Sequence, residues 1–235
     1  MMEFIMDDSK IENQFKTILK QLNQTKNGVV ADSLTARGFK YKMNLGSNIV
    51  TLRGLAKQYD RNHLLALKLW NKQWRETMIL ATMLEEPSTL TEQQMDYWAK
   101  SFETTEIAEQ AVINLFPESK FAYIKALEWC RGKKFLVKYT GLLLMGRLAM
   151  VDKKGLDEMF EPFLEVIAPL MRDPQLSNVM VRSFGQVGRR SKQLNDMALE
   201  FLSVLRVDEN KEAQAVAEEL ITELSSEWVQ ESFKE

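Results

Sequence analysis

Two segments of the 235-residue chain concentrate basic side chains without any acidic residue. Arg131–Met150 holds five lysines and arginines, and Pro174–Leu194 holds four. By contrast, Glu85–Ser119 holds eight acidic residues and a single lysine, Lys100. Such segregation of charge can produce a basic surface. The same clusters can equally be ordinary solvated helix faces.

The formal net charge of −2 conceals this segregation. Residues 207–235 carry nine acidic residues and two lysines, a net charge of −7, which leaves +5 on residues 1–206. A basic surface is therefore compatible with a slightly acidic chain.

The sequence lacks the motifs of several classes of enzyme and metal-binding protein. Glycine-rich phosphate loops, a nucleophile elbow, a metalloprotease helix and an EF-hand loop are all absent from the sequence. One histidine, His63, and one cysteine, Cys130, exclude an ordinary zinc site of Cys and His ligands as well as an internal disulfide. No signal-peptide layout and no uncharged apolar run approaching about 18 residues is present. We therefore expect a cytoplasmic protein with no metal, no cofactor and no membrane partner.

The elements that must position the charged residues are helices. Apolar residues recur at three- and four-residue steps, the spacing of one helix face. The clearest case is Arg61–Leu84, which predicts two helices, Leu64–Trp70 and Trp74–Leu84, with a break at Asn71–Gln73. Such a pair cannot bury its apolar stripe alone and needs similar pairs stacked on either side.

The same pattern recurs along the chain, and no segment sustains the alternation of a strand. Further helices are predicted at about Asp8–Leu22, Val29–Arg37, Asn48–Tyr59, Glu92–Lys100, Thr105–Phe116, Phe121–Trp129, Lys134–Met150, Leu156–Met171 with a kink near Pro169, Leu176–Arg190, Leu194–Val204 and Glu212–Leu224. We expect an all-α stack of roughly six helical pairs. It should form a single domain over residues 1–235, monomeric, that ends in an acidic helix at about 208–235.

In this order of helices the chain resembles the AlkD-like DNA alkylation repair proteins, a family of HEAT-like repeat DNA glycosylases. The matching residues are Leu45–Gly46 followed by Leu52–Arg53, Leu55 and Lys57; Leu69–Trp70 with Arg75–Glu76; Glu106–Val112; Phe135–Leu142; and Phe184–Arg189. The resemblance implies a HEAT-like helical-repeat solenoid, an α-α superhelix, with a basic concave groove for duplex DNA.

The resemblance also implies an activity, namely excision of purines that carry a positive charge after alkylation. A cationic purine is already a good leaving group, so the protein mainly stabilises the oxocarbenium-like sugar with a carboxylate. Alignment places Glu109 at the catalytic carboxylate, with Glu106 as the alternative one turn earlier. Lys138 takes the place of an active-site arginine. The basic residues that would contact DNA are Arg53, Lys133, Lys134, Arg182, Arg189 and Arg190.

The chain departs from the family pattern at three positions. Thr105 and Gln186 stand where the family has tryptophans, and Lys138 lacks the bidentate fork of an arginine. A non-catalytic DNA-binding member of the family therefore stays open, as does a helical-repeat scaffold that binds protein. Glu106 and Glu109 would be favoured in the first turn of a helix whatever their function. We interpret Arg75 as an ion-pairing residue between repeats, a role that Arg53 could share.

Overall fold

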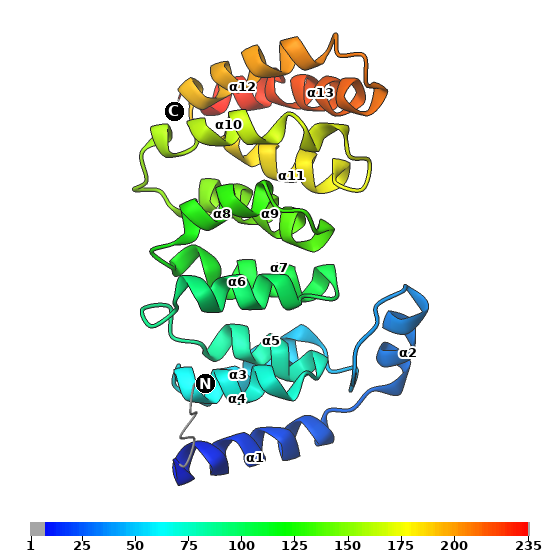
Figure 1. Cartoon of the computed structure of the whole chain (residues 1–235), viewed down its shortest axis with the longest axis vertical. Helices are drawn as coiled ribbons and strands as arrows, with labels where there is room; N and C mark the ends of the chain where they lie inside the picture. Colours follow the sequence, from blue (N-terminus) through cyan, green and yellow to red (C-terminus); the bar gives the residue numbers. More distant parts are fainter. Residues whose placement is uncertain (1–7, 235) are drawn as a thin grey trace. The chain divides into compact units, whose positions relative to one another are not determined.

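The computed structural model describes residues 8–234 of the chain. Within this range it contains fourteen α-helices and no β-strand (Figure 1), so the all-α prediction is confirmed. The helices are α1 Ser9–Gln24, α2 Gly28–Ala36, α3 Ile49–Ala56, α4 His63–Lys72, α5 Arg75–Leu84, α6 Glu92–Ser101, α7 Thr105–Asn114, α8 Ala122–Cys130, α9 Phe135–Val151, α10 Glu161–Ile167, α11 Ser177–Gly188, α12 Lys192–Leu205, α13 Lys211–Leu224 and α14 Glu227–Ser232. In residues 8–234 no helix combines the length and the apolar composition needed to cross a membrane.

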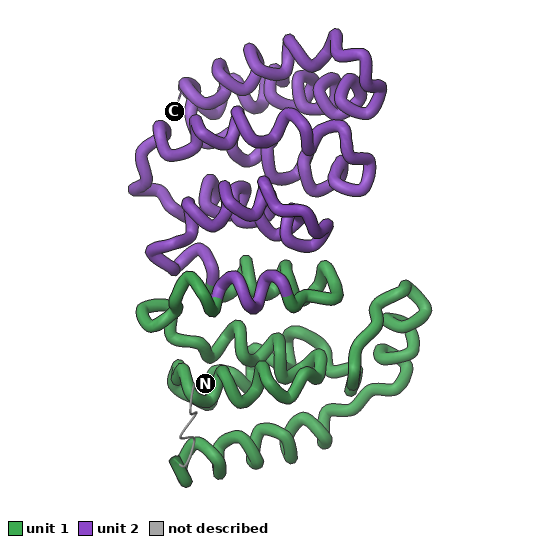
Figure 2. Tube along the Cα trace, in the orientation of Figure 1, with its two compact units in different colours: residues 1–94, 101–115 green, residues 95–100, 116–235 purple. Residues whose placement is uncertain are grey.

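The chain divides into two compact units (Figure 2). Unit 1 comprises residues 1–94 and 101–115, and unit 2 comprises residues 95–100 and 116–235. Helices α1 to α5 and α7 therefore belong to unit 1, whereas α8 to α14 belong to unit 2. A single domain over residues 1–235 stays a prediction.

In unit 1, α4 and α5 form the helical pair that the sequence predicts. Leu69 and Trp70 of α4 are fully buried. The break falls at Gln73, which adopts a left-handed backbone with φ 57° and donates its N–H to the Trp70 carbonyl at 3.0 Å. Helix α5 is buried along almost its whole length, including its first two residues, Arg75 and Glu76. The start of α5 therefore places charged side chains inside the unit.

In unit 2, α9 packs against both α8 and α11. A Cβ atom added to Gly146 of α9 would lie 2.7 Å from the Cα of Ser183, so α9 and α11 approach closely where only glycine fits. Lys138 at the start of α9 bonds Asp173, which precedes α11, and Arg190 after α11 bonds the Ala149 carbonyl near the end of α9. These contacts show that the two helices run in the same direction.

Two predicted segments differ from the structure. Leu156–Met171 is not one helix but the 3-10 turn Asp157–Met159, the short helix α10 and the 3-10 turn Leu170–Arg172. The prolines explain this, because Pro162 occupies the first turn of α10 and Pro169 has no N–H to continue it.

The acidic helix predicted at about 208–235 is also interrupted, and its last residue lies outside the described residues. It consists of α13 and α14, which break at Ser225 and Ser226. Serine favours helix ends over helix interiors, and the break lets Val229 of α14 become fully buried.

Candidate functional site

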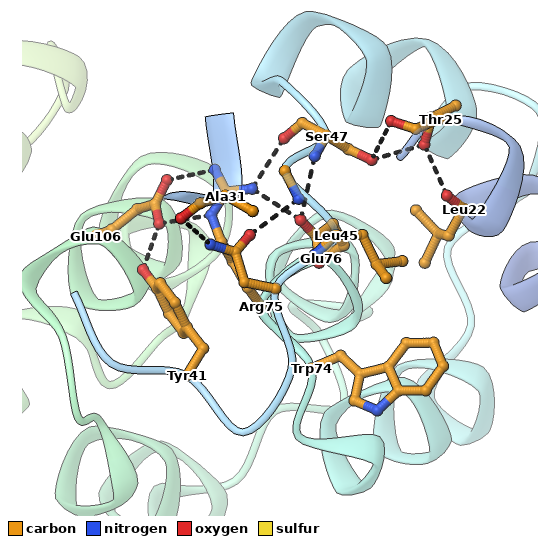
Figure 3. Close-up of polar contacts among 12 residues, drawn as sticks. Leu22, Thr25, Ala31, Tyr41, Leu45, Ser47, Trp74, Arg75, Glu76 and Glu106 are labelled. Carbon is orange, nitrogen blue, oxygen red and sulfur yellow. Dashed lines mark hydrogen bonds and ion pairs between the residues drawn. The ribbon is translucent and has the colours of Figure 1, made fainter. Parts of the chain in front are cut away.

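The first candidate carboxylate, Glu106, lies in the first turn of α7, whose N-cap is Thr104. Arg75 of α5 donates to both of its carboxylate oxygens, from Nη2 at 2.6 Å and from Nε at 2.8 Å (Figure 3). The Tyr41 hydroxyl donates to the same carboxylate. Both oxygens of Glu106 are therefore occupied by side chains of unit 1.

Arg75 also binds a second carboxylate. Its Nη1 lies 2.9 Å from Glu76 Oε1 and 2.8 Å from the Ser47 carbonyl. The Glu76 carboxylate in turn accepts from the backbone N–H groups of Leu45, at 3.1 Å, and Ser47, at 3.2 Å. Arg75 is 3% exposed and Glu76 is fully buried, whereas the Glu106 side chain is 17% exposed. We call Tyr41, Arg75, Glu76 and Glu106 the Arg75 cluster. The prediction that Arg75 pairs with acidic residues is confirmed.

The contacts in this cluster shift the pKa values of Glu106 and Tyr41. Burial alone would raise the pKa of Glu106, but hydrogen bonds from Arg75 and Tyr41 outweigh it and hold that pKa below its ordinary value. Burial, together with the hydrogen bond to Glu106, raises the pKa of the Tyr41 hydroxyl. Glu106 is thus an ionised partner of Arg75.

The second candidate carboxylate, Glu109, is one turn further along α7 and is partly exposed. It belongs to unit 1, whereas Lys138 belongs to unit 2. Lys138 Nζ lies 2.7 Å from Asp173 Oδ2, and this hydrogen bond is the main reason that the pKa of Asp173 is lowered. The structure therefore assigns Lys138 an acidic partner within its own unit.

Acidic residues from outside the basic segments neutralise several of their cations. Arg189 pairs with Glu223 of α13. Arg190, 7% exposed, pairs with Asp157 at 3.0 Å and donates to the carbonyls of Ala149, Asp152 and Gly155. These bonds tie Arg190 to the turn after α9, which is a structural role.

A different group of cations stays at the surface of unit 2. Arg131, Lys133 and Lys134 fill the connection between α8 and α9, and all three are exposed. Lys134 Nζ lies 3.4 Å from the Lys100 carbonyl, while Arg131 and Lys133 form no ion pair within residues 8–234. Arg182 is an exposed residue of α11, the helix that packs beside α9. We call Arg131, Lys133, Lys134 and Arg182 the unit 2 basic set.

Arg53, predicted to contact DNA, lies in unit 1. It is exposed on α3 and lines a shallow hollow together with Lys57 and Arg61.

Sequence reasoning missed two features. Phe135 and Tyr139 form an aromatic pair on α9, with ring centroids 5.7 Å apart, and both are partly exposed just after the basic residues. Their four-residue spacing was the available signal. The second feature is Arg37–Met43, in which cations alternate with aromatic residues before α3. Thr105 and Gln186, the departures from the family pattern, are both partly exposed.

Within the described part of the chain, no group of three or more His, Cys, Asp and Glu residues could hold a metal ion. Comparison with known proteins found no family model and no curated protein that match the chain. One solved structure is similar, with a TM-score of 0.68 and 19% sequence identity over 88% of this chain and 93% of that chain. It is described as "A new family of proteins related to the HEAT-like repeat DNA glycosylases with affinity for branched DNA structures". The likeness shows that this chain has the fold of the HEAT-like repeat proteins, so the predicted fold class is confirmed.

Proposed function

We propose that this chain is a DNA-binding protein of the HEAT-like repeat class that does not excise bases. The proposal rests on one observation, namely the difference in exposure and ion pairing between two groups of charged residues. Arg131, Lys133 and Lys134 are exposed, whereas the Glu106 carboxylate is bound by Arg75 and the Lys138 ammonium is bound by Asp173.

Exposed cations suit DNA for a physical reason. Each lysine or arginine that replaces a condensed counterion on a phosphate contributes to binding, without requiring a particular base. Arg131, Lys133 and Lys134 lie within four residues, so one stretch of phosphates can meet several of them. The aromatic pair Phe135 and Tyr139 follows directly and offers ring faces on which an unpaired base can stack. The affinity of the structural neighbour for branched DNA supports the same proposal.

The glycosylase function predicted from the family resemblance is the second candidate, and Glu109 is what favours it. This carboxylate is partly exposed on α7, one turn beyond the cluster that holds Glu106. A catalytic carboxylate must be able to reach the sugar, which Glu106 could do only by breaking its bonds to Arg75 and Tyr41. Base excision would therefore depend on Glu109 alone, without metal or cofactor.

The test combines binding and catalysis on the full chain, which we take to act as a cytoplasmic monomer. Labelled duplex and four-way-junction DNA are titrated at several salt concentrations, and methylated duplex DNA is assayed for released purines. We expect binding that weakens steeply as salt rises, because counterions are released on association, and no base release. Absence of binding to both DNAs at low salt would overturn the proposal. Repeated release of methylated purines would instead establish the glycosylase.

A further inference from the structure

The connection between α2 and α3 in unit 1 contains a second concentration of cations. Its sequence, RGFKYKM over Arg37–Met43, has three basic residues and no acidic one. Arg37, Lys40 and Lys42 are all exposed, and Phe39 is partly exposed with the Arg37 guanidinium 5.8 Å from its ring centre. We call Arg37–Met43 the basic loop.

The basic loop is anchored through its central tyrosine. Tyr41 points to the Arg75 cluster, where its hydroxyl donates to Glu106 (Figure 3). The same hydroxyl accepts from the Thr104 hydroxyl at 3.2 Å. Tyr41 is partly buried, whereas Lys40 and Lys42 on either side of it are exposed.

Hydrogen bonds also fix the backbone of residues 43–47, which follow Tyr41 and Lys42. The Arg75 N–H donates to the Met43 carbonyl at 2.9 Å, and Glu76 accepts from Leu45 and Ser47. Gly46 has φ 74°, and a Cβ there would lie 1.9 Å from the Asn27 carbonyl oxygen, so only glycine allows this approach to α2. Buried charges therefore fix an irregular segment that has no secondary structure of its own.

This arrangement points to a role beyond packing. A loop whose backbone is ordered by folding loses less conformational freedom when a ligand binds, so its cations contribute more affinity. We propose that the basic loop is a second DNA contact, in which Lys40 and Lys42 bind backbone phosphates. The buried Arg75 cluster acts through Tyr41 as its positioning device. This inference rests on the proposed DNA-binding function.

The direct test is the double variant Lys40→Gln/Lys42→Gln. Its matched control is Lys20→Gln/Lys26→Gln, which removes the same charge from exposed positions of the same unit. Binding to duplex DNA is measured across a salt series. The loop variant should bind about tenfold more weakly at moderate salt, with a salt slope shallower by roughly 0.9 for each phosphate that is no longer bound. The control should match the wild type.

A third variant, Tyr41→Phe, tests the positioning role. It removes the hydroxyl that anchors the loop but no charge, so affinity should fall while the salt slope stays that of the wild type. Unchanged affinity in Tyr41→Phe would overturn the positioning role. If the wild type binds and the Lys40/Lys42 variant has the same affinity and slope, the proposal for the basic loop is wrong and the proposed function stands. A wild type that does not bind at all would overturn both.

Discussion

The Arg75 cluster of unit 1 and the basic set of unit 2 use similar side chains in opposite ways. Arg75 is 3% exposed and donates to two carboxylates and a carbonyl, so its charge is neutralised by partners within the fold. The residues Arg131 and Lys133 are exposed and form no ion pair within the described residues. From the sequence, Arg75 is predicted to pair with acidic residues, whereas Lys133 and Lys134 are predicted to contact DNA. Burial is what separates a charge that holds the fold from one that can meet a ligand.

The physical basis of the difference is the free energy of desolvation. A buried charge is tolerated only when its partners satisfy nearly all of its hydrogen bonds. The planar guanidinium of Arg75 achieves this by donating to Glu76, Glu106 and the Ser47 carbonyl at the same time. Removing Arg75 would leave the Glu76 and Glu106 carboxylates without the cation that they share.

Arg75→Leu should lower the stability of the fold more than any change at an exposed cation. It leaves the fully buried Glu76 without its cation, so the free energy of unfolding should fall by about 3–5 kcal/mol. Urea denaturation measures this directly. The matched control, Arg53→Leu at an exposed position of α3, should change it by no more than about 0.5 kcal/mol. A loss below about 1 kcal/mol in Arg75→Leu would show that the cluster is not structural.

Acid should weaken the cluster through Glu106. Because the folded-state pKa of Glu106 lies below its ordinary value of 4.5, its ionised form stabilises the fold above that pH. This stability is lost as the pH falls through the lowered folded-state pKa. Urea denaturation of the wild type and of Glu106→Gln should therefore differ most near neutral pH and converge below about 4.5. A difference that stays constant down to pH 3 would contradict the ion pair. Glu103→Gln, at an exposed position nearby, is the control.

Glu109→Gln should have the smallest effect. A partly exposed carboxylate with no catalytic role can be neutralised with a change of about 0.5 kcal/mol or less in stability, and DNA affinity should stay within about twofold. Fluorescence anisotropy with duplex DNA measures the affinity. If the wild type releases methylated purines and Glu109→Gln does not, α7 contains a catalytic carboxylate as well as the structural carboxylate of Glu106. The division into a structural unit 1 cluster and a DNA-binding unit 2 set would then be wrong.

Much of the fold follows from sequence periodicity, since one apolar face repeats in helix after helix. The break near Gln73 and the pairing of α4 with α5 were predictable because Leu69, Trp70 and the helix-end residues are local signals. The site was less predictable. The carboxylate that pairs with Arg75 comes from Glu106, 31 residues away, and the partner of Lys138 is Asp173, 35 residues away. Such long-range ion pairs leave no local pattern, so the sequence did not reveal the acidic partners of Lys138, Arg189 and Arg190.

The central claim is that the exposed cations before α9 bind DNA phosphates. The most direct measurement compares the salt dependence of duplex binding in the wild type with that of Arg131→Gln/Lys133→Gln/Lys134→Gln. Lys120→Gln/Lys153→Gln/Lys154→Gln removes the same charge from exposed positions of the same unit and serves as the control. We predict a loss of affinity of at least about tenfold, with a salt slope shallower by roughly 0.9 for each phosphate that is no longer bound, in the first variant only. Equal affinities and equal slopes in the two triple variants would contradict the claim.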